Sequence, residues 1–218
     1  FSRKYMKSDG KKLRKFWRKV KDYPYLIIDI RGNGGGSDYY WMQNLVQPLI
    51  SEPIHVTADV AYKGGEYSLP FIKARYEKLY PIEKLPAKPN YPPELDQFKY
   101  FTRLDVTLKP TKSVNFEGKI YLLVDSAVFS SSETFAVFCK STNWARLVGE
   151  RTGGDGIGID PIFMTLPNSG IVVRFPIDMG LNPDGGANEE HQTVPDIKSN
   201  SPLNKVQSII YKELEENK

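Results

Sequence analysis

The sequence is poor in the residues that build disulfides and metal sites. Its 218 residues contain one cysteine, Cys139, and two histidines, His55 and His191. A single cysteine cannot form an internal disulfide, so a disulfide-stapled module is excluded. The three side chains are widely scattered in the sequence and do not make a ligand set, so we expect neither a metal nor an organic cofactor.

Long apolar runs are also lacking. No stretch approaches the roughly 18 apolar residues of a transmembrane helix, and the first seven residues have no apolar segment, so we expect neither an integral membrane segment nor a signal peptide. The chain is 40% hydrophobic and 26% charged, which is typical of a globular protein that buries a core. At roughly 100–200 residues per domain, the length allows one large domain or one with a sizeable insertion.

Positive charge is concentrated at one end of the chain. The net charge is +4, yet residues 1–21 hold ten of the thirty Lys and Arg residues and one acid, Asp9. Apolar residues of this stretch recur at helical spacing, namely Leu13, Phe16, Trp17 and Val20. We predict an amphipathic helix, capped by Ser8 or Asp9 and ended by Pro24, whose basic face is solvated. This interpretation is favoured over a nucleic-acid or membrane-surface patch, and no nucleic-acid partner is expected.

Alternating patterns predict an α/β fold. Residues 25–30 are almost all apolar and are typical of a central parallel strand covered on both faces. Further strands are predicted at residues 54–62, 120–125 and 146–149, and helices at residues 37–45, at residues 133–140 and from about residue 204, where Val206, Ile209, Ile210 and Leu214 would face inward. Strands that alternate with helices indicate an α/β core.

Two segments depart from this alternation. Residues 63–118 contain seven of the sixteen prolines and only short helical patches near residues 71–80 and 98–104, so we interpret them as an insertion in a single domain spanning residues 1–218. Residues 163–166 and 171–175 flank Pro-Asn-Ser-Gly and predict a β-hairpin.

A glycine-rich turn follows the first predicted strand. Residues 31–36 read Arg-Gly-Asn-Gly-Gly-Gly. The dinucleotide fingerprint G-x-G-x-x-G fails at its sixth position, Ser37, and no P-loop Gly-Lys-Ser/Thr occurs, so a nucleotide site is disfavoured. Three consecutive residues without a Cβ indicate that something approaches this backbone closely.

Three serines precede a predicted helix. Residues 130–133 read Ser-Ser-Ser-Glu, directly after the strand that ends near Asp125. A serine at a strand-to-helix turn is well placed as a nucleophile, because the helix N-terminus stabilises developing negative charge. Ser-x-x-Glu is also a capping box, which the local pattern alone favours. Both readings hold if one serine caps and another reacts.

Two more segments combine polar residues with turns. Residues 148–156 read Val-Gly-Glu-Arg-Thr-Gly-Gly-Asp-Gly, and residues 189–197 read Glu-Glu-His-Gln-Thr-Val-Pro-Asp-Ile. Each is unspecific alone. In their order along the chain, the four motifs resemble the catalytic core of the C-terminal processing (tail-specific) serine peptidases. The resemblance covers residues 20–50 and 118–200, and the glycine motif is its most specific part.

The resemblance implies a fold, an activity and a set of site residues. The fold is α/β, with a crotonase- or ClpP-like core of ββα units and a loop-rich insertion at residues 63–118, and the substrate is a peptide or protein. The nucleophile is the serine three positions before the glutamate, Ser130 here, with Ser131 and Ser132 as the other possibilities. The oxyanion hole is formed by the N–H of Ser131 and a glycine N–H, that of Gly34 or Gly35.

Two branches of that family differ in their base. One uses a lysine in a Gly-Lys-Gly turn, but residues 154–156 read Gly-Asp-Gly, and an aspartate cannot serve as a neutral amine base. The other branch is similar to the tricorn protease core and uses a histidine with a glutamate seven residues before the Pro-Asp aspartate. Counting back from Asp196 gives Glu189, with Glu190 as the second choice.

In that second branch the histidine lies N-terminal to the strand that leads into the glycine motif, a place that neither His55 nor His191 matches. We therefore expect the base in an N-terminal subdomain outside this chain, and weak or no peptide hydrolysis by the chain alone. Family members are usually exported or bound to the cell envelope. A PDZ module, common among them, is not recognisable here.

Two other functions fit parts of the pattern. A non-catalytic relative would bind a peptide or an apolar ligand, as the retinoid-binding proteins of the eye do with this core. The retained Ser130, glycine triplet and Glu189 speak against it. A crotonase-like acyl-CoA enzyme also builds its oxyanion hole from backbone N–H groups, but the sequence offers no clear nucleotide pocket.

Overall fold

The computed structural model describes residues 3–75, 78–158 and 161–216. Contacts divide the chain into two compact units. The first unit holds residues 1–56, 105–156 and 192–218, and the second holds residues 57–104 and 157–191. None of the described helices is both long enough and apolar enough to cross a membrane.

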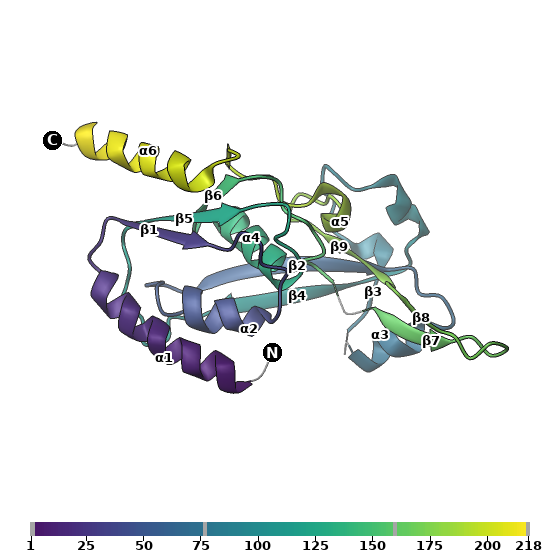
Figure 1. Cartoon of the computed structure of the whole chain (residues 1–218). Helices are drawn as coiled ribbons and strands as arrows, with labels where there is room; N and C mark the ends of the chain where they lie inside the picture. The colour runs from purple at the N-terminus through teal and green to yellow at the C-terminus, as the bar shows by residue number, and fades with distance from the viewer. Residues whose placement is uncertain (1–2, 76–77, 159–160, 217–218) are drawn as a thin grey trace. The chain divides into compact units, whose positions relative to one another are not determined.

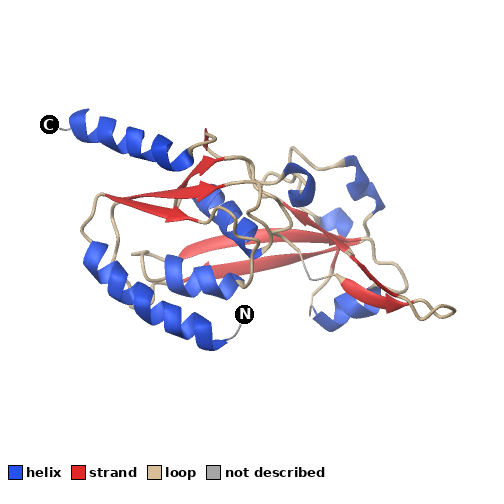
Figure 2. Cartoon of the chain, in the orientation of Figure 1, coloured by secondary structure: helices blue, strands red, loops and turns tan. Residues whose placement is uncertain are grey.

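The first unit is built on a parallel sheet with helices on both faces (Figures 1 and 2). Its elements are α1 (Arg3–Val20), β1 (Tyr25–Asp29), α2 (Asp38–Trp41), the π-helical η1 (Met42–Val46), β5 (Lys119–Val124), α4 (Ser131–Thr142), β6 (Arg146–Gly149), β10 (Ile197–Lys198) and α6 (Pro202–Glu216). The strand order is β1-β5-β6-β10, with all neighbours parallel. The α/β class is confirmed. However, β1 lies at an edge of this sheet, so its prediction as a central strand was wrong.

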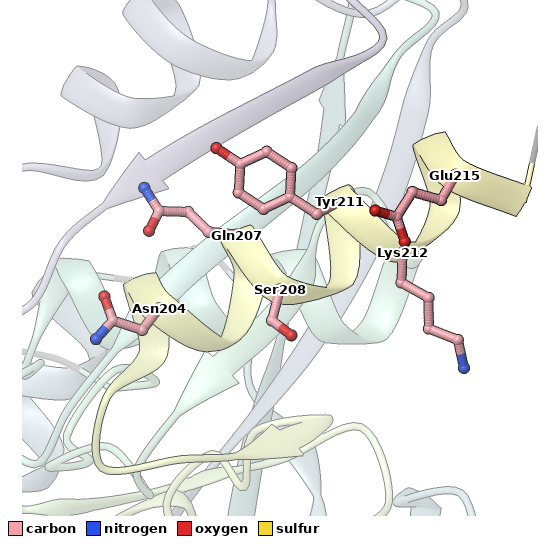
Figure 3. A pocket seen from close by; sticks show the side chains of 6 residues that line it. All are labelled: Asn204, Gln207, Ser208, Tyr211, Lys212 and Glu215. Atoms are coloured by element: carbon pink, nitrogen blue, oxygen red, sulfur yellow. The ribbon is translucent and has the colours of Figure 1, made fainter. Parts of the chain in front are cut away.

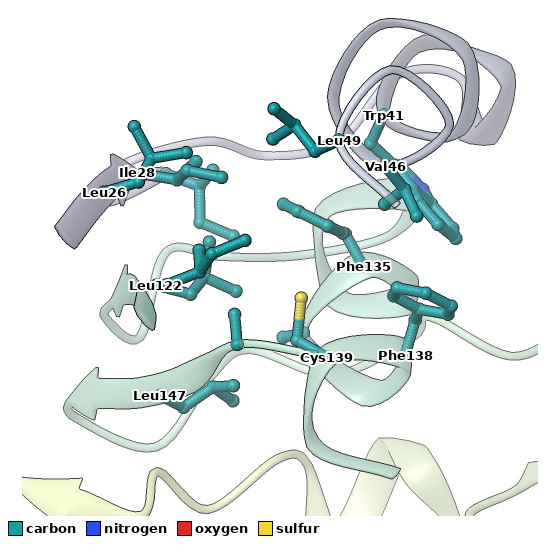
Figure 4. Packing of buried hydrophobic residues seen from close by; sticks show 14 of the residues in the cluster. Leu26, Ile28, Trp41, Val46, Leu49, Leu122, Phe135, Phe138, Cys139 and Leu147 are labelled. Atoms are coloured by element: carbon teal, nitrogen blue, oxygen red, sulfur yellow. The ribbon is translucent and has the colours of Figure 1, made fainter. Parts of the chain in front are cut away.

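Alternate residues of the parallel strands point to opposite faces of the sheet. On one face, Leu26 and Leu122 pack in a core that includes Phe135 of α4 (Figure 4). On the other face, Tyr121 packs in a core that includes Val206 of α6. Fully burying a side chain such as leucine contributes about 1.5–3 kcal/mol, so both faces stabilise the sheet.

The outer helices differ from their predictions in two ways. Helix α1 begins at Arg3, before the predicted caps. In it, Trp17 is 3% exposed and donates its indole N–H to the Asn44 carbonyl at 2.9 Å, but Phe16 is 47% exposed. The packed stripe is therefore narrower than predicted. In α6, Val206 is fully buried and Leu214 is 42% exposed, so burial declines toward its C-terminal end.

The second unit contains the hairpin and most of an antiparallel sheet. The elements here are β2 (Ile54–Tyr62), α3 (Leu69–Arg75), β3 (Tyr80–Pro81), η2 (Ile82–Lys84), η3 (Pro93–Gln97), β4 (Tyr100–Leu108), β7 (Ile162–Thr165), β8 (Val172–Phe175), β9 (Asp178–Leu181) and α5 (Asn188–His191). The sheet order is β3-β4-β2-β9, and the boundary between the units falls within β2 and β4. The predicted hairpin is confirmed as β7 and β8.

Strand β4 corrects the helical patch predicted at residues 98–104. It is a nine-residue strand, rich in the aromatic and β-branched residues that fit a pleated surface. In the patch predicted at residues 71–80, residues 71–75 lie in α3, residues 76–77 lie outside the described residues, and residues 78–79 are not helical. The predicted helix at residues 37–45 is also altered, because α2 continues as the π-helical η1.

Candidate active site

Three turns leave the same edge of the parallel sheet. β1, β5 and β6 run parallel, so their carboxyl ends meet at one edge, where α/β proteins usually bind ligands. β1 leads into residues 31–36, here called the glycine turn, and β5 leads into residues 125–130, the serine turn. β6 leads into residues 149–156, the support loop. The sequence motifs of the first unit are thus brought together by topology.

Side chains hold the glycine turn in place. Both carboxylate oxygens of Asp125 accept the N–H of Gly32 at 3.0 Å. The side-chain oxygen of Asn33 accepts the N–H of Gly35 at 3.0 Å. Among the described residues, no acceptor takes the N–H of Gly34. Of the two glycines predicted for the oxyanion hole, Gly34 is therefore the one whose N–H is open.

An ion pair ties the end of β1 to the glycine turn. The Arg31 guanidinium donates to both oxygens of Asp29, at 2.9 and 2.7 Å. These side-chain hydrogen bonds are the main reason that the pKa of Asp29 lies below its usual value, and they also raise the pKa of Arg31. Both groups are charged at neutral pH. Because both are well exposed to solvent, the pair orients the turn more than it stabilises the fold.

The backbone of Ser130 is strained. Its φ is 55° and its ψ is −127°, a combination that residues with a side chain seldom adopt. Such a conformation costs on the order of 1–3 kcal/mol and persists only where the surroundings impose it. A strained strand-to-helix turn of this kind presents the nucleophilic serine in α/β-hydrolases.

The predicted capping box does not form. Ser130 is the N-cap residue of α4, but its side chain makes no capping hydrogen bond. The positive φ explains this, because a capping serine needs an extended backbone. Ser131 and Ser132 lie inside the first turn of α4, so Ser130 alone of the three has the strained conformation. Glu133 accepts the Thr193 hydroxyl at 2.6 Å.

The glycine turn and the serine turn touch where Gly35 has no side chain. A Cβ placed on Gly35 would lie 2.7 Å from the Ser130 Cβ and 3.1 Å from the Ser131 nitrogen. The absence of a Cβ therefore allows the backbone to approach the residues predicted as nucleophile and oxyanion donor. This confirms the close approach inferred from the glycine triplet.

The support loop lies on the other side of the serine turn. Gly154 and Phe129 form a parallel bridge, and the Gly154 carbonyl accepts the N–H of Ser130 at 3.1 Å. Asp155 is exposed and has a φ of 57°. The position that carries the lysine in the Ser-Lys branch is thus occupied here by an exposed acid.

Asp196 of the Val-Pro-Asp motif is a structural anchor. Its carboxylate accepts the Lys140 ammonium of α4 at 2.8 Å and the N–H of Leu147 in β6 at 2.8 Å. Lys140 also donates to the Val194 carbonyl at 2.7 Å. The sequence indicated this motif only by its order in the chain. Its local pattern carried no sign that the aspartate joins a helix to a strand.

The remaining candidate residues belong to other elements of the chain. Glu189, Glu190 and His191 are exposed residues of α5 in the second unit, whereas Ser130 belongs to the first unit. His55 is an exposed residue of β2, and its Nδ1 lies 2.9 Å from the Thr107 hydroxyl on β4. In the described part of the chain, no three His, Cys, Asp or Glu side chains form a group that could hold a metal ion.

An open pocket on α6 contains none of these residues. It is lined by a single helix face, comprising Asn204, Gln207, Ser208, Tyr211, Lys212 and Glu215 (Figure 3). This pocket is therefore separate from the candidate site at the carboxyl edge of the sheet, which we describe by its backbone geometry and hydrogen bonds.

The fold and the serine turn define an α/β protein with a strained strand-to-helix turn at Ser130. The model of peptidase family S41 matches residues 2–199, and the chain belongs to this family. Among curated proteins, none matches the chain.

Three solved structures share the fold at low sequence identity. A candidate peptidase from Parabacteroides merdae has a TM-score of 0.66 and 19% identity, over 92% of this chain and 56% of that one. Mature CPAF in complex with lactacystin has a TM-score of 0.63 and 18% identity, over 94% and 46%. The photosystem II D1 C-terminal processing protease has a TM-score of 0.56 and 16% identity, over 91% and 40%. This chain spans 40–56% of their lengths.

Proposed function

We propose that this chain is the catalytic core of a serine endopeptidase in which Ser130 forms the acyl-enzyme. The observation that carries the proposal is the strained, positive-φ backbone of Ser130 at a strand-to-helix turn. Membership of a peptidase family supports the same reaction class. The proposal treats residues 1–218 as one domain with an insertion at residues 63–118 and a crotonase- or ClpP-like core.

The proposed reaction has two stages. The Ser130 oxygen attacks the scissile carbonyl carbon while its proton passes to a general base, and the N–H groups of Ser131 and Gly34 hold the resulting oxyanion. The C–N bond then breaks, and the base returns the proton to the leaving amine. Water attacks the acyl-enzyme and gives a proton to the base, and the Ser130 oxygen leaves with that proton.

The base and its orienting carboxylate complete the proposal. Residue 155 is an aspartate and not a lysine, which favours the histidine branch. The histidine is proposed to come from an N-terminal subdomain of the same protein, with Glu189 as the carboxylate that orients it and Glu190 as the second choice. The proposed substrate is a peptide or protein, with tail-specific cleavage as the narrower form of the proposal.

Labelling with a fluorophosphonate probe tests the nucleophile. In the longer protein that contains this chain, we expect the probe on the peptide that holds Ser130, with labelling abolished in Ser130→Ala. The matched control is Ser126→Ala, which removes an exposed serine four residues earlier. Absence of labelling at Ser130 would favour a non-catalytic relative that binds a peptide or an apolar ligand.

Peptide hydrolysis by the isolated chain tests the source of the base. A serine without its base keeps only the oxyanion hole and substrate binding, and activity falls by several orders of magnitude. We expect little or no turnover. If turnover by the chain alone is measurable and is lost in Ser130→Ala, the base lies within the chain, and His191 becomes its candidate.

A further inference from the structure

The support loop forms hydrogen bonds with the backbone around Ser130. The N–H of Gly153 donates to the Val128 carbonyl at 2.6 Å, and the Gly154 carbonyl accepts the N–H of Ser130 at 3.1 Å. These two hydrogen bonds hold the chain on both sides of Phe129. A strained conformation persists only where its surroundings impose it, and the support loop is part of the surroundings that contact Ser130.

The support loop is itself held by two buried threonines. Thr152 donates its N–H to the Thr193 carbonyl at 3.1 Å, and Thr193 donates its N–H to the Thr152 hydroxyl oxygen at 2.8 Å. The Thr193 hydroxyl in turn donates to a carboxylate oxygen of Glu133 at 2.6 Å. Thr152, Thr193 and Glu133 are 2%, 5% and 0% exposed, respectively. Burial removes competing water and strengthens these hydrogen bonds.

These contacts close a ring around the serine turn. Glu133 follows Ser130 by three residues in the first turn of α4, so the ring runs from Ser130 through Glu133, Thr193 and Thr152 to Gly154 and back. We propose that Thr152, Thr193 and Glu133 form a positioning network that imposes the strained backbone of Ser130. The proposal rests on the proposed function only in its catalytic consequence, since the conformational consequence is measurable without activity.

A second contact supports the same geometry. The Thr134 hydroxyl donates to the Gly156 carbonyl, and a Cβ on Gly156 would lie 2.6 Å from the Glu133 Cγ. The far end of the support loop is thus packed against the first turn of α4. The support loop is therefore held at Thr152 by the network and at Gly156 by this second contact.

Hydrogen–deuterium exchange tests the conformational consequence on this chain. Thr193→Val keeps the shape of the side chain but removes the hydroxyl that donates to Glu133. We expect exchange in the peptide covering residues 126–136 to accelerate about tenfold or more. Local opening of this segment costs less free energy in the variant, because the hydrogen bond between Thr193 and Glu133 is already missing. Thr193→Ser restores the hydroxyl and should restore slow exchange. The matched control is Thr57→Val, at an exposed strand position.

Kinetics test the catalytic consequence in the longer protein. In Thr193→Val we expect kcat to fall by about 10- to 100-fold with KM within about twofold, because a small misplacement of the nucleophile affects the chemical step most. Thr193→Ser should stay within about threefold of the parent, since the hydroxyl is retained. Thr152→Val removes the acceptor of the Thr193 N–H and tests the network independently.

The outcomes separate this inference from the proposed function. Unchanged exchange in both Thr193→Val and Thr152→Val would overturn the network. An unchanged kcat in these variants, with Ser130→Ala inactive, would overturn its catalytic role and leave the proposed function standing. Turnover that persists in Ser130→Ala would overturn the proposed function, while the exchange data still decide whether the network imposes the conformation.

Discussion

The glycine turn and the support loop flank the same serine but are held by different means. The glycine turn is held by charged and amide side chains at the surface, where Asp125 binds the N–H of Gly32 and Arg31 binds Asp29. The support loop is held by the buried hydroxyl and backbone groups of Thr152 and Thr193. Both turns are rich in glycine, yet only one is exposed along most of its length.

This difference assigns the two turns different tasks. An exposed turn whose Gly34 N–H is open can meet a substrate, whereas a loop that is anchored by buried threonines and hydrogen-bonded to Val128 and Ser130 can hold the nucleophile. Changes in the support loop should therefore reduce stability and activity together. Changes in the glycine turn should reduce activity more than stability.

The largest effect is expected from Gly149→Ala, at the start of the support loop. A Cβ there would lie 1.9 Å from the Val124 carbonyl oxygen, and the φ of Gly149 is 144°. Because the opposing atom is backbone, relief requires movement of β5, and we expect the free energy of unfolding to fall by about 3 kcal/mol or more. Urea denaturation measures this. Gly65→Ala, at an exposed glycine, is the control, and equal midpoints for the two variants would contradict the prediction.

Gly35→Ala tests the other side of the comparison. The added Cβ would crowd the Ser130 Cβ and the Ser131 nitrogen, at 2.7 and 3.1 Å. We expect fluorophosphonate labelling of Ser130 to slow by about 100-fold, because the nucleophile and its oxyanion donor are displaced together. The φ of 104° adds a stability loss of about 1–2 kcal/mol. If Gly35→Ala is labelled as fast as the parent and is equally stable, the glycine turn accommodates the added Cβ without displacing Ser130, and the prediction is wrong.

Local patterns predicted the elements that frame the site but not the conformation of Ser130. β5, α4 and β6 were predictable because buried parallel strands are continuous apolar runs separated by a helix. The local pattern at residues 130–133 favoured a capping box, since Ser-x-x-Glu satisfies helix-capping rules. The positive φ of Ser130 goes with a hydrogen bond to Gly154, 24 residues further along the chain, and only the family resemblance pointed to this serine among the three.

The threonine network could not be predicted from local sequence patterns either. Thr152 and Thr193 are separated by 41 residues and become partners only when β6 and the segment before β10 lie side by side. Threonines at such positions have no periodic or capping signature, so nothing local distinguished them. Strand β4 was missed for a related reason, because its pairing with β2 and β3 decided between helix and strand.

A smaller effect is expected from Asp125→Asn in the link between the glycine turn and the serine turn. The carboxylate accepts the N–H of Gly32 and of Ala127. An amide keeps one acceptor oxygen and loses the charge, so we expect a stability loss of about 1 kcal/mol and a several-fold slower labelling of Ser130. Glu117→Gln, at an exposed carboxylate, is the control. If Asp125→Asn is labelled as fast as this control, the Asp125 carboxylate does not hold the glycine turn in its reactive position.

The smallest effect is a pH dependence of the glycine turn. The Arg31 side chain lowers the pKa of Asp29, so the stability that this pair contributes is fully present above the unfolded pKa of about 3.9 and is lost as pH falls through the lower folded value. Solvent screening keeps this contribution small, because both side chains are exposed. The urea midpoints measured at pH 7 and pH 3 should differ less in Arg31→Met than in the parent. Adding 0.5 M salt should make the parent more similar to Arg31→Met in this respect, because salt screens exposed charges. An identical pH response in parent and Arg31→Met would mean that the exposed charges do not hold the glycine turn.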